Sequence, residues 1–167
     1  RRTPKLQAPA MTDTPTVTFQ TVDPRSPDAV ACLQAYYDEL ASRFDTGFDV
    51  NLSADPDATD MLAPRGAFLV AYAGAQVRGC VGVKGTDKGY GEIKRLWVSP
   101  EARGLGLSKR LMDQAEKTAR TLGIATLRLD TNAALPEAIR LYQTTGWTEI
   151  DRFNDDPYPD FFFEKHL

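Results

Sequence analysis

Residues 92–114 combine an apolar strand, a glycine-containing turn and the start of a helix. The pattern predicts a turn over 103–108, with the sequence RGLGLS, and a helix that begins within it. The first N–H groups of a helix lack partners inside it, and the helix dipole places partial positive charge at that end. Gly104 and Gly106 carry no Cβ, so a bulky anion can approach the backbone closely. With Arg103 as an added cation, the turn is predicted to bind a pyrophosphate.

The turn matches neither of two common phosphate-binding motifs. The P-loop pattern G-x-x-x-x-G-K-[ST] occurs nowhere in the chain, and the dinucleotide fingerprint G-x-G-x-x-G fails because position 109 is Lys. The turn reads R-x-x-G-x-S instead. A glycine-softened helix start without a ligand stays open as the alternative at this point.

The composition bounds the class of protein. A chain of 167 residues supports one buried core, so we expect a single domain over 16–167, preceded by a disordered tail or an artificial extension over 1–15. The formal charge of −3 argues against nucleic acid as a partner. The sequence has no apolar run of membrane-spanning length and no signal-peptide pattern, which favours no membrane partner and a cytoplasmic location. Two cysteines and one histidine predict no metal site.

The order of predicted elements is that of an α/β protein. Apolar spacing after Ser26 predicts a helix, and Gly74-Ala75 predicts a hairpin turn. The core-facing stripe of that helix is predicted to be Val30, Leu33, Tyr37, Leu40 and Phe44. The predicted strands are 16–22, 67–73, 76–84, 90–98, 125–131, 147–153 and 160–166, and the later helices are 56–61, 105–122 and 136–144. A right-handed crossover should place strand 125–131 parallel to strand 90–98, and the two should diverge above the helix start.

Two segments, RLWVSPEARGLGLSKRLM and TNAALPEAIRLYQTTGWTEI, together resemble the cofactor segments of the GNAT superfamily of N-acetyltransferases. The acetyl-CoA signature of that family is [QR]-x-x-G-x-[GA], and Ser108 stands where Gly or Ala is usual. The resemblance extends from Thr16 to Leu167. It implies a mixed, mostly antiparallel central sheet of about six or seven strands flanked by helices, splayed between the fourth and fifth strands.

The resemblance also implies acetyl-CoA as co-substrate and assigns residues to it. Main-chain groups of the strand end are expected to hold the pantetheine arm and the acetyl carbonyl, with the Val98 amide as an oxyanion donor. Tyr142 is expected to donate a proton to the departing thiolate, and its alternative is a buried core aromatic. The residues assigned to the cofactor are Leu96, Trp97, Val98, Arg103, Gly104, Leu105, Gly106, Leu107, Ser108, Asn132 and Tyr142.

Acyl transfer to an amine also requires a base. An alkylamine with a pKa of about 10.4 needs about 4.6 kcal/mol to present its neutral form at neutral pH. Loss of one oxyanion donor costs roughly 2.7 to 4 kcal/mol. Deprotonating the amine therefore requires at least as much free energy as one oxyanion donor supplies. Glu92 is the predicted catalytic base, because it precedes the expected splay on the same strand. The alternative is a strand glutamate paired with Lys94, Arg95 or another cation.

The acceptor is the least specified part of the site. The predicted function is acetyl transfer to the primary amine of a small molecule by direct attack in a ternary complex. The alternatives are a peptide or protein N-acetyltransferase and a catalytically weak acyl-CoA-binding sensor, and a homodimer through the last strands is compatible with each. The predicted acceptor contacts are Tyr36, Phe44, Phe48, Asn154 and Asp155. An acidic mouth for a cationic amine is predicted from Glu92, Asp49, Asp155, Asp156 and Asp160, with a solvated acidic loop as the alternative.

Overall fold

The computed structural model describes residues 16–44 and 59–167. The predicted tail over 1–15, the acceptor candidates Phe48 and Asp49, and the first part of the helix predicted over 56–61 lie outside the described residues.

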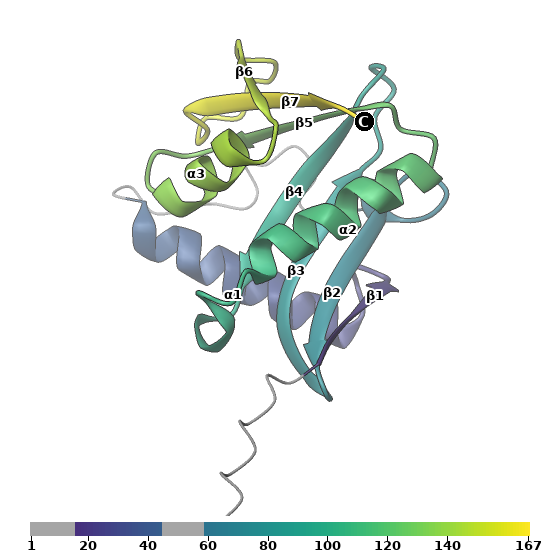
Figure 1. Ribbon diagram of the computed structural model, residues 1–167, viewed down its shortest axis with the longest axis vertical. Coiled ribbons are helices and arrows are strands. Elements are labelled where there is room, and N and C mark those ends of the chain that lie inside the picture. Colours follow the sequence, from purple (N-terminus) through teal and green to yellow (C-terminus); the bar gives the residue numbers. More distant parts are fainter. Residues whose placement is uncertain (1–15, 45–58) are drawn as a thin grey trace, which may run out of the picture.

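In the described part of the chain, seven strands form one sheet in the order β1-β2-β3-β4-β5-β7-β6 (Figure 1). All neighbouring pairs are antiparallel except β4 and β5, which run parallel. The mixed, mostly antiparallel sheet predicted above is therefore confirmed. The strands are β1 Val17–Val22, β2 Ala67–Ala73, β3 Gln76–Lys84, β4 Gly91–Val98, β5 Thr126–Thr131, β6 Thr148–Ile150 and β7 Phe161–His166.

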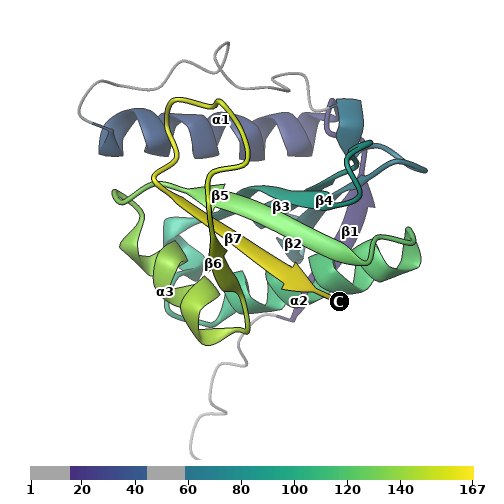
Figure 2. The same ribbon diagram turned by 90° about the horizontal axis from the view of Figure 1, so that it is seen from above.

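Helices cover both faces of this sheet. Helix α1 (Pro27–Arg43) lies on one face, and α2 (Leu107–Thr121) and α3 (Pro136–Thr144) lie on the other (Figure 2). Two short 3₁₀ turns, η2 (Thr59–Met61) and η3 (Pro100–Ala102), complete the elements of the described residues. Helix α2 begins two residues later than the sequence predicted, because Gly106 adopts a left-handed conformation and acts as its N-cap.

Side-chain alternation along the central strands divides the core into two layers. On β2, Leu69 and Ala71 pack in the cluster that includes α2, whereas Phe68 and Val70 pack in the cluster that includes α1. Successive strand residues point to opposite faces, so a fully buried strand needs apolar residues at every position. This explains why β2 reads as a continuous apolar run.

Helix α1 buries Leu33 and Leu40 of the predicted apolar stripe, but Val30 departs from it. Ala29 and Cys32 are buried, whereas Val30 is 50% exposed. The prediction that Val30 faces the core was wrong. The Cys32 thiol lies 3.8 Å from the Gly79 carbonyl oxygen of β3, whereas Val30 is on the solvent side of the helix.

The parallel pair β4–β5 holds together at only one end. The paired residues are Gly91 with Leu127 and Glu92 with Arg128, and no later residue of β4 pairs with β5. From Ile93 to Val98, the edge of β4 that faces β5 therefore has no neighbouring strand. The predicted splay is confirmed, and it opens the sheet between β4 and β5.

A β-bulge interrupts β4 inside the splayed region. Cys80 of β3 pairs with Trp97 and Gly82 pairs with Lys94, so two steps on β3 oppose three on β4. Arg95 has a φ of 55°, which a non-glycine residue rarely adopts. The extra residue shifts the alternation of side chains past this point. The rule that every second strand residue points to the same face therefore does not hold across Arg95.

Candidate active site

The splay opens a pocket whose floor is the free edge of β4. The lining comes from β4, from the turn after it and from helices α1 and α3. We call it the cofactor pocket. Its lining residues are Tyr36, Glu39, Leu40, Arg43, Leu96, Trp97, Val98, Ala102, Arg103, Gly104, Gly106, Leu107, Ser108, Leu135, Glu137, Ala138 and Leu141. Eight of the residues that the sequence assigned to a cofactor lie here, whereas Leu105 is outside the lining and 62% exposed.

The turn at 103–108 has the properties that an anion-binding turn requires. Gly104 and Gly106 have φ values of 80° and 75°, which glycine adopts without strain. A Cβ at either position would meet nothing within 4 Å, so the requirement for glycine is conformational. No side chain caps the N-terminus of α2, which leaves its first N–H groups available to a ligand. These observations fit a phosphate group at the turn.

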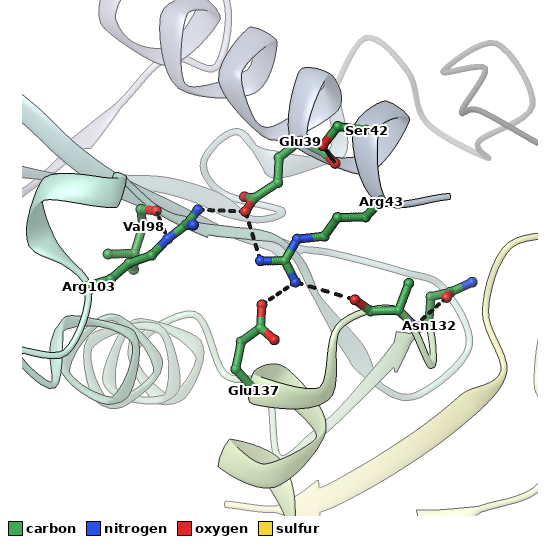
Figure 3. Close-up of polar contacts among 8 residues, drawn as sticks. Glu39, Ser42, Arg43, Val98, Arg103, Asn132 and Glu137 are labelled. Carbon is green, nitrogen blue, oxygen red and sulfur yellow. Dashed lines mark hydrogen bonds and ion pairs between the residues drawn. The ribbon is translucent and has the colours of Figure 1, made fainter. Parts of the chain in front are cut away.

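Four charged side chains bridge the pocket from the turn to α1 and α3 (Figure 3). Arg103 donates to Val98 O at 3.2 Å and to Glu39 Oε1 at 2.6 Å. Glu39 also accepts from Arg43 at 3.1 Å, and Arg43 pairs in turn with Glu137. We call Arg103, Glu39, Arg43 and Glu137 the bridging network.

Sequence reasoning missed three members of this network. Glu39 and Arg43 lie four residues apart on α1, a spacing that usually indicates an exposed helix pair. Their approach to Arg103 depends on how α1 crosses the splay, which no local pattern reveals. A surplus of charge on the pocket-facing side of α1 is the only local signal.

A second pocket adjoins the first and shares Tyr36, Leu40, Leu96, Leu135 and Ala138 with it. We call it the acceptor pocket, and its volume is about 110 Å³. Aromatic side chains form part of its wall, and Phe44 stacks on Tyr158 with ring centroids 5.5 Å apart. The predicted contacts Tyr36 and Phe44 lie in this lining. The remaining lining residues are Tyr37, Lys84, Ile93, Lys94, Arg95, Asp130, Thr131, Asn132, Tyr142, Asp156 and Pro159.

Tyr142 lies in the acceptor pocket, close to the shared wall. The residue is 4% exposed, and its ring contacts Trp147 and Phe163. Burial, with a smaller contribution from the charge of Asp130, raises the pKa of this phenol well above its usual range. The hydroxyl therefore carries its proton at neutral pH. This position is compatible with both predictions for Tyr142, a proton donor to the thiolate and a buried core aromatic.

Glu92 does not line the acceptor pocket. It is 8% exposed, and Lys94 Nζ lies 3.8 Å from its carboxylate. The same ammonium lies 3.5 Å from Asp130, which accepts a 2.7 Å hydrogen bond from Asn154. Asp130 of β5 does line the acceptor pocket, and sequence reasoning missed it because the alternation of β5 does not show which face the splay exposes.

An outer pocket continues beyond Lys94 toward the loop before β7. It contains the predicted residues Glu92, Asn154, Asp155 and Asp156, but it also contains several cations: Arg65, Lys84, Lys88, Lys94 and Arg152. Asp160 accepts a hydrogen bond from the Ala133 amide at 3.0 Å and caps the turn after β5. The proposed acidic mouth therefore includes as many basic as acidic side chains in the outer pocket.

Asn132 connects the end of β5 to this loop. Its amide donates to Tyr158 O at 2.6 Å and its carbonyl oxygen accepts from the Ala134 N–H at 2.7 Å. The side chain lines the acceptor pocket and holds the loop at 154–159 against the start of α3. Asn132, which the resemblance assigns to the pantetheine arm, thus lines the acceptor pocket and not the cofactor pocket.

Two further properties concern residues 16–44 and 59–167 only. None of the helices there combines the length and the apolar character needed to cross a lipid bilayer. No group of three or more His, Cys, Asp or Glu side chains is arranged there to hold a metal ion.

Comparison with known proteins gives consistent matches. The family model described as Acetyltransferase (GNAT) family matches residues 30–147. IAA acetyltransferase of Azospirillum brasilense is 37% identical over 116 residues, which cover 66% of this chain and 74% of that protein. An acetyltransferase of GNAT family from Staphylococcus aureus superposes with a TM-score of 0.79 at 20% identity, covering 91% of this chain and 99% of the other.

A structure with bound ligand has the same fold. The GNAT family acetyltransferase from Elizabethkingia anophelis, with acetyl-CoA bound, has a TM-score of 0.63 at 15% identity and covers 90% of this chain and 98% of its own.

Proposed function

The chain belongs to the acetyltransferase (GNAT) family, whose members take their acetyl group from acetyl-CoA, and we propose that its acceptor is the primary amine of a small molecule. The amine attacks the thioester directly while both substrates are bound. One observation carries this proposal: the cofactor pocket and the acceptor pocket meet at Leu96, on the unpaired edge of β4. An acyl group presented there faces the acceptor pocket, whose volume is about 110 Å³.

Acetyl-CoA fits the residues of the cofactor pocket. The pyrophosphate is proposed to rest on the turn at 103–108, where uncapped N–H groups and Arg103 supply positive charge. The pantetheine arm follows the edge of β4, whose main-chain groups are free of a strand partner on that side. The Val98 amide is the proposed oxyanion donor. No side chain of the described residues is needed as a covalent carrier.

The attacking amine must lose a proton before or during attack. We assign this proton to Glu92, reached directly or through water, and Asp130 is a second candidate because it lines the acceptor pocket itself. Both carboxylates contact Lys94. The neutral nitrogen then bonds to the carbonyl carbon, the C–S bond breaks, and the thiolate takes a proton from the Tyr142 hydroxyl. The second proton that the nitrogen loses on forming the amide returns to Tyr142, directly or through water. Products are the acetamide and CoA.

The proposal is tested by CoA release. We expect thiol to be released from acetyl-CoA with at least one class of small primary amines, and we expect Tyr142→Phe to lower kcat with little change in the Kd of acetyl-CoA. A panel of short peptides with free N-termini or lysine side chains serves as the comparison. Faster release with peptides than with any small amine would replace the small-molecule acceptor by a peptide.

Thermal unfolding separates catalysis from binding. If acetyl-CoA raises Tm but no amine or peptide releases thiol, the chain is a binding module and the proposed reaction is wrong. If Tyr142→Phe and Glu92→Gln both turn over at the wild-type rate, the reaction stands and the assigned roles are wrong.

A further inference from the structure

Lys84, the last residue of β3, is a buried cation that the proposed reaction does not use. It is 9% exposed, and it lines both the acceptor pocket and the outer pocket. In the sheet it stands opposite Glu92, but the carboxylate of Glu92 contacts Lys94 instead. Among the described residues, the Lys84 ammonium has no hydrogen bond or ion pair.

The neighbouring charges are already engaged. Lys94 lies 3.5 Å from Asp130 and 3.8 Å from Glu92. Arg95 donates to the Tyr37 hydroxyl at 2.8 Å. The two acids in the acceptor pocket also have partners, since Asp130 accepts from Asn154 and Asp156 accepts from the Tyr158 amide. Of the three cations that line the acceptor pocket, Lys84 is the one for which the described part of the chain supplies no hydrogen bond or ion pair.

The Lys84 side chain is largely covered, but it lines two pockets, so its ammonium can be reached by a ligand. An ion pair formed in such a partly covered site is screened less by water than one on the open surface. An anion that enters the pocket would form an ion pair with the Lys84 ammonium. The acceptor pocket has three cationic and two acidic side chains in its lining, so a simple cationic amine gains little there. An amine that also carries a negative group gains an ion pair in a partly desolvated site.

We propose that the acceptor is an amine that carries a carboxylate, such as an α-amino acid, and that Lys84 binds the carboxylate. This inference rests on the proposed function and narrows its substrate class. The carboxylate lies against Lys84, at the end of the pocket formed by β3, and the amine points toward Leu96 and Tyr142. The aromatic wall of Phe44 and Tyr158 suits an apolar side chain on the same molecule. Lys84 is a specificity-determining residue here, since it acts on the acceptor and not on the acetyl group.

Matched acceptors test the inference. We would measure kcat/KM for L-phenylalanine, L-phenylalaninamide and 2-phenylethylamine, and for L-leucine, L-leucinamide and isopentylamine, at saturating acetyl-CoA. We expect each acid to exceed its amide and its amine by tenfold or more. In Lys84→Met, which removes the charge and shortens the side chain by one atom, this preference should fall below twofold. Lys117→Met removes an exposed lysine of α2 and should leave the preference unchanged.

Binding gives a readout that does not need turnover. The same six compounds are titrated into the CoA-loaded protein by calorimetry, in wild type and in Lys84→Met. Tighter binding of the acids that is lost in Lys84→Met supports the inference. Equal binding of acids and amines, or a preference that survives Lys84→Met, overturns it.

The two proposals fail in different ways. If amino acids and their neutral analogues release thiol at equal rates, the proposed carboxylate preference is wrong and the proposed acetyl transfer stands. If the amino acids bind more tightly than their neutral analogues but no compound releases thiol, the proposed acetyl transfer is wrong and the proposed carboxylate site stands. Acetyl-CoA should raise Tm equally in wild type and Lys84→Met, which shows that the variant is folded.

Discussion

Arg103 donates a 2.6 Å hydrogen bond to Glu39, a residue 64 positions earlier in the chain. This contact joins the glycine turn to helix α1 across the cofactor pocket (Figure 3). It occupies the cation that the turn would offer to a pyrophosphate. In the proposed complex, the pyrophosphate of acetyl-CoA competes with the Glu39 carboxylate for the Arg103 guanidinium, while Glu39 keeps its contact with Arg43.

Variants of this pair should change acetyl-CoA affinity in opposite directions. Arg103→Ala removes a charge-assisted contact and should raise the Kd about tenfold, or about 1.4 kcal/mol. Glu39→Gln removes the competing carboxylate and should lower the Kd. Calorimetric titration measures both, with Lys109→Ala, at an exposed site on α2, as the control. Weaker binding in Glu39→Gln would mean that the bridging network supports the pocket instead of competing for it.

Glu92→Gln and Asp130→Asn distinguish the two candidate bases. Loss of a general base costs about 10²- to 10⁴-fold in rate, so we expect Glu92→Gln to lower kcat at least a hundredfold at pH 7. The deficit should shrink as the pH approaches the pKa of the amine, because solvent then supplies the neutral nucleophile. Glu149→Gln, at an exposed position of β6, is the control. A larger loss in Asp130→Asn, with the same pH dependence, would transfer the role to Asp130.

The buried phenol of Tyr142 predicts a loss of stability at high pH. Burial raises its pKa in the folded state, whereas in the unfolded chain it titrates near its ordinary value of about 10. Above about pH 10 the unfolded state releases a proton that the folded state retains. The free energy of unfolding should then fall by about 1.4 kcal/mol per pH unit from this group. Below about pH 10, Tyr142 should not contribute to the pH dependence of the free energy of unfolding.

Urea denaturation between pH 8 and 11.5 measures this dependence. Tyr142→Phe should reduce the alkaline slope by the contribution of one proton, whatever other groups titrate in that range. Equal slopes in the wild type and in Tyr142→Phe would show that the hydroxyl is already accessible to solvent in the folded protein.

Gly106 and Gly123 flank helix α2 and form a matched pair of substitutions. Their φ values are 75° and 81°, and a Cβ would meet nothing within 4 Å at either site. Alanine at either position should cost about 1–2 kcal/mol of stability through backbone strain alone. Only Gly106→Ala should also weaken acetyl-CoA binding, because only Gly106 lies in the cofactor pocket. Equal effects of both variants on the Kd would contradict a phosphate site at the turn.

Local patterns predicted the elements of the fold well. The hairpin at Gly74, the strand before the turn at 103–108 and the helix after it depend on alternation, on glycine and on helix-start chemistry, all of which act over a few residues. The right-handed crossover then requires β4 and β5 to run parallel. Eight residues assigned to the cofactor consequently lie together in one pocket.

The face that α1 presents was not accessible to the same reasoning. Val30 fits an apolar stripe, but the side of the helix that faces the sheet carries Ala29 and Cys32, which are buried, and Val30 is half exposed. The bulge at Arg95 has a similar origin, since its φ of 55° is imposed by pairing with β3 and not by a local preference.

By itself, the sequence determined the strand, the glycine turn and the helix over 92–114, because their causes are local. Only the tertiary structure decided which charges meet around them. It joined Arg103 to Glu39, placed Asp130 beside Lys94, and left Lys84 buried at the end of β3 without a partner among the described residues. Such pairings depend on which strands separate and how α1 crosses the gap, and electrostatic contacts between distant residues leave no periodic trace in the chain.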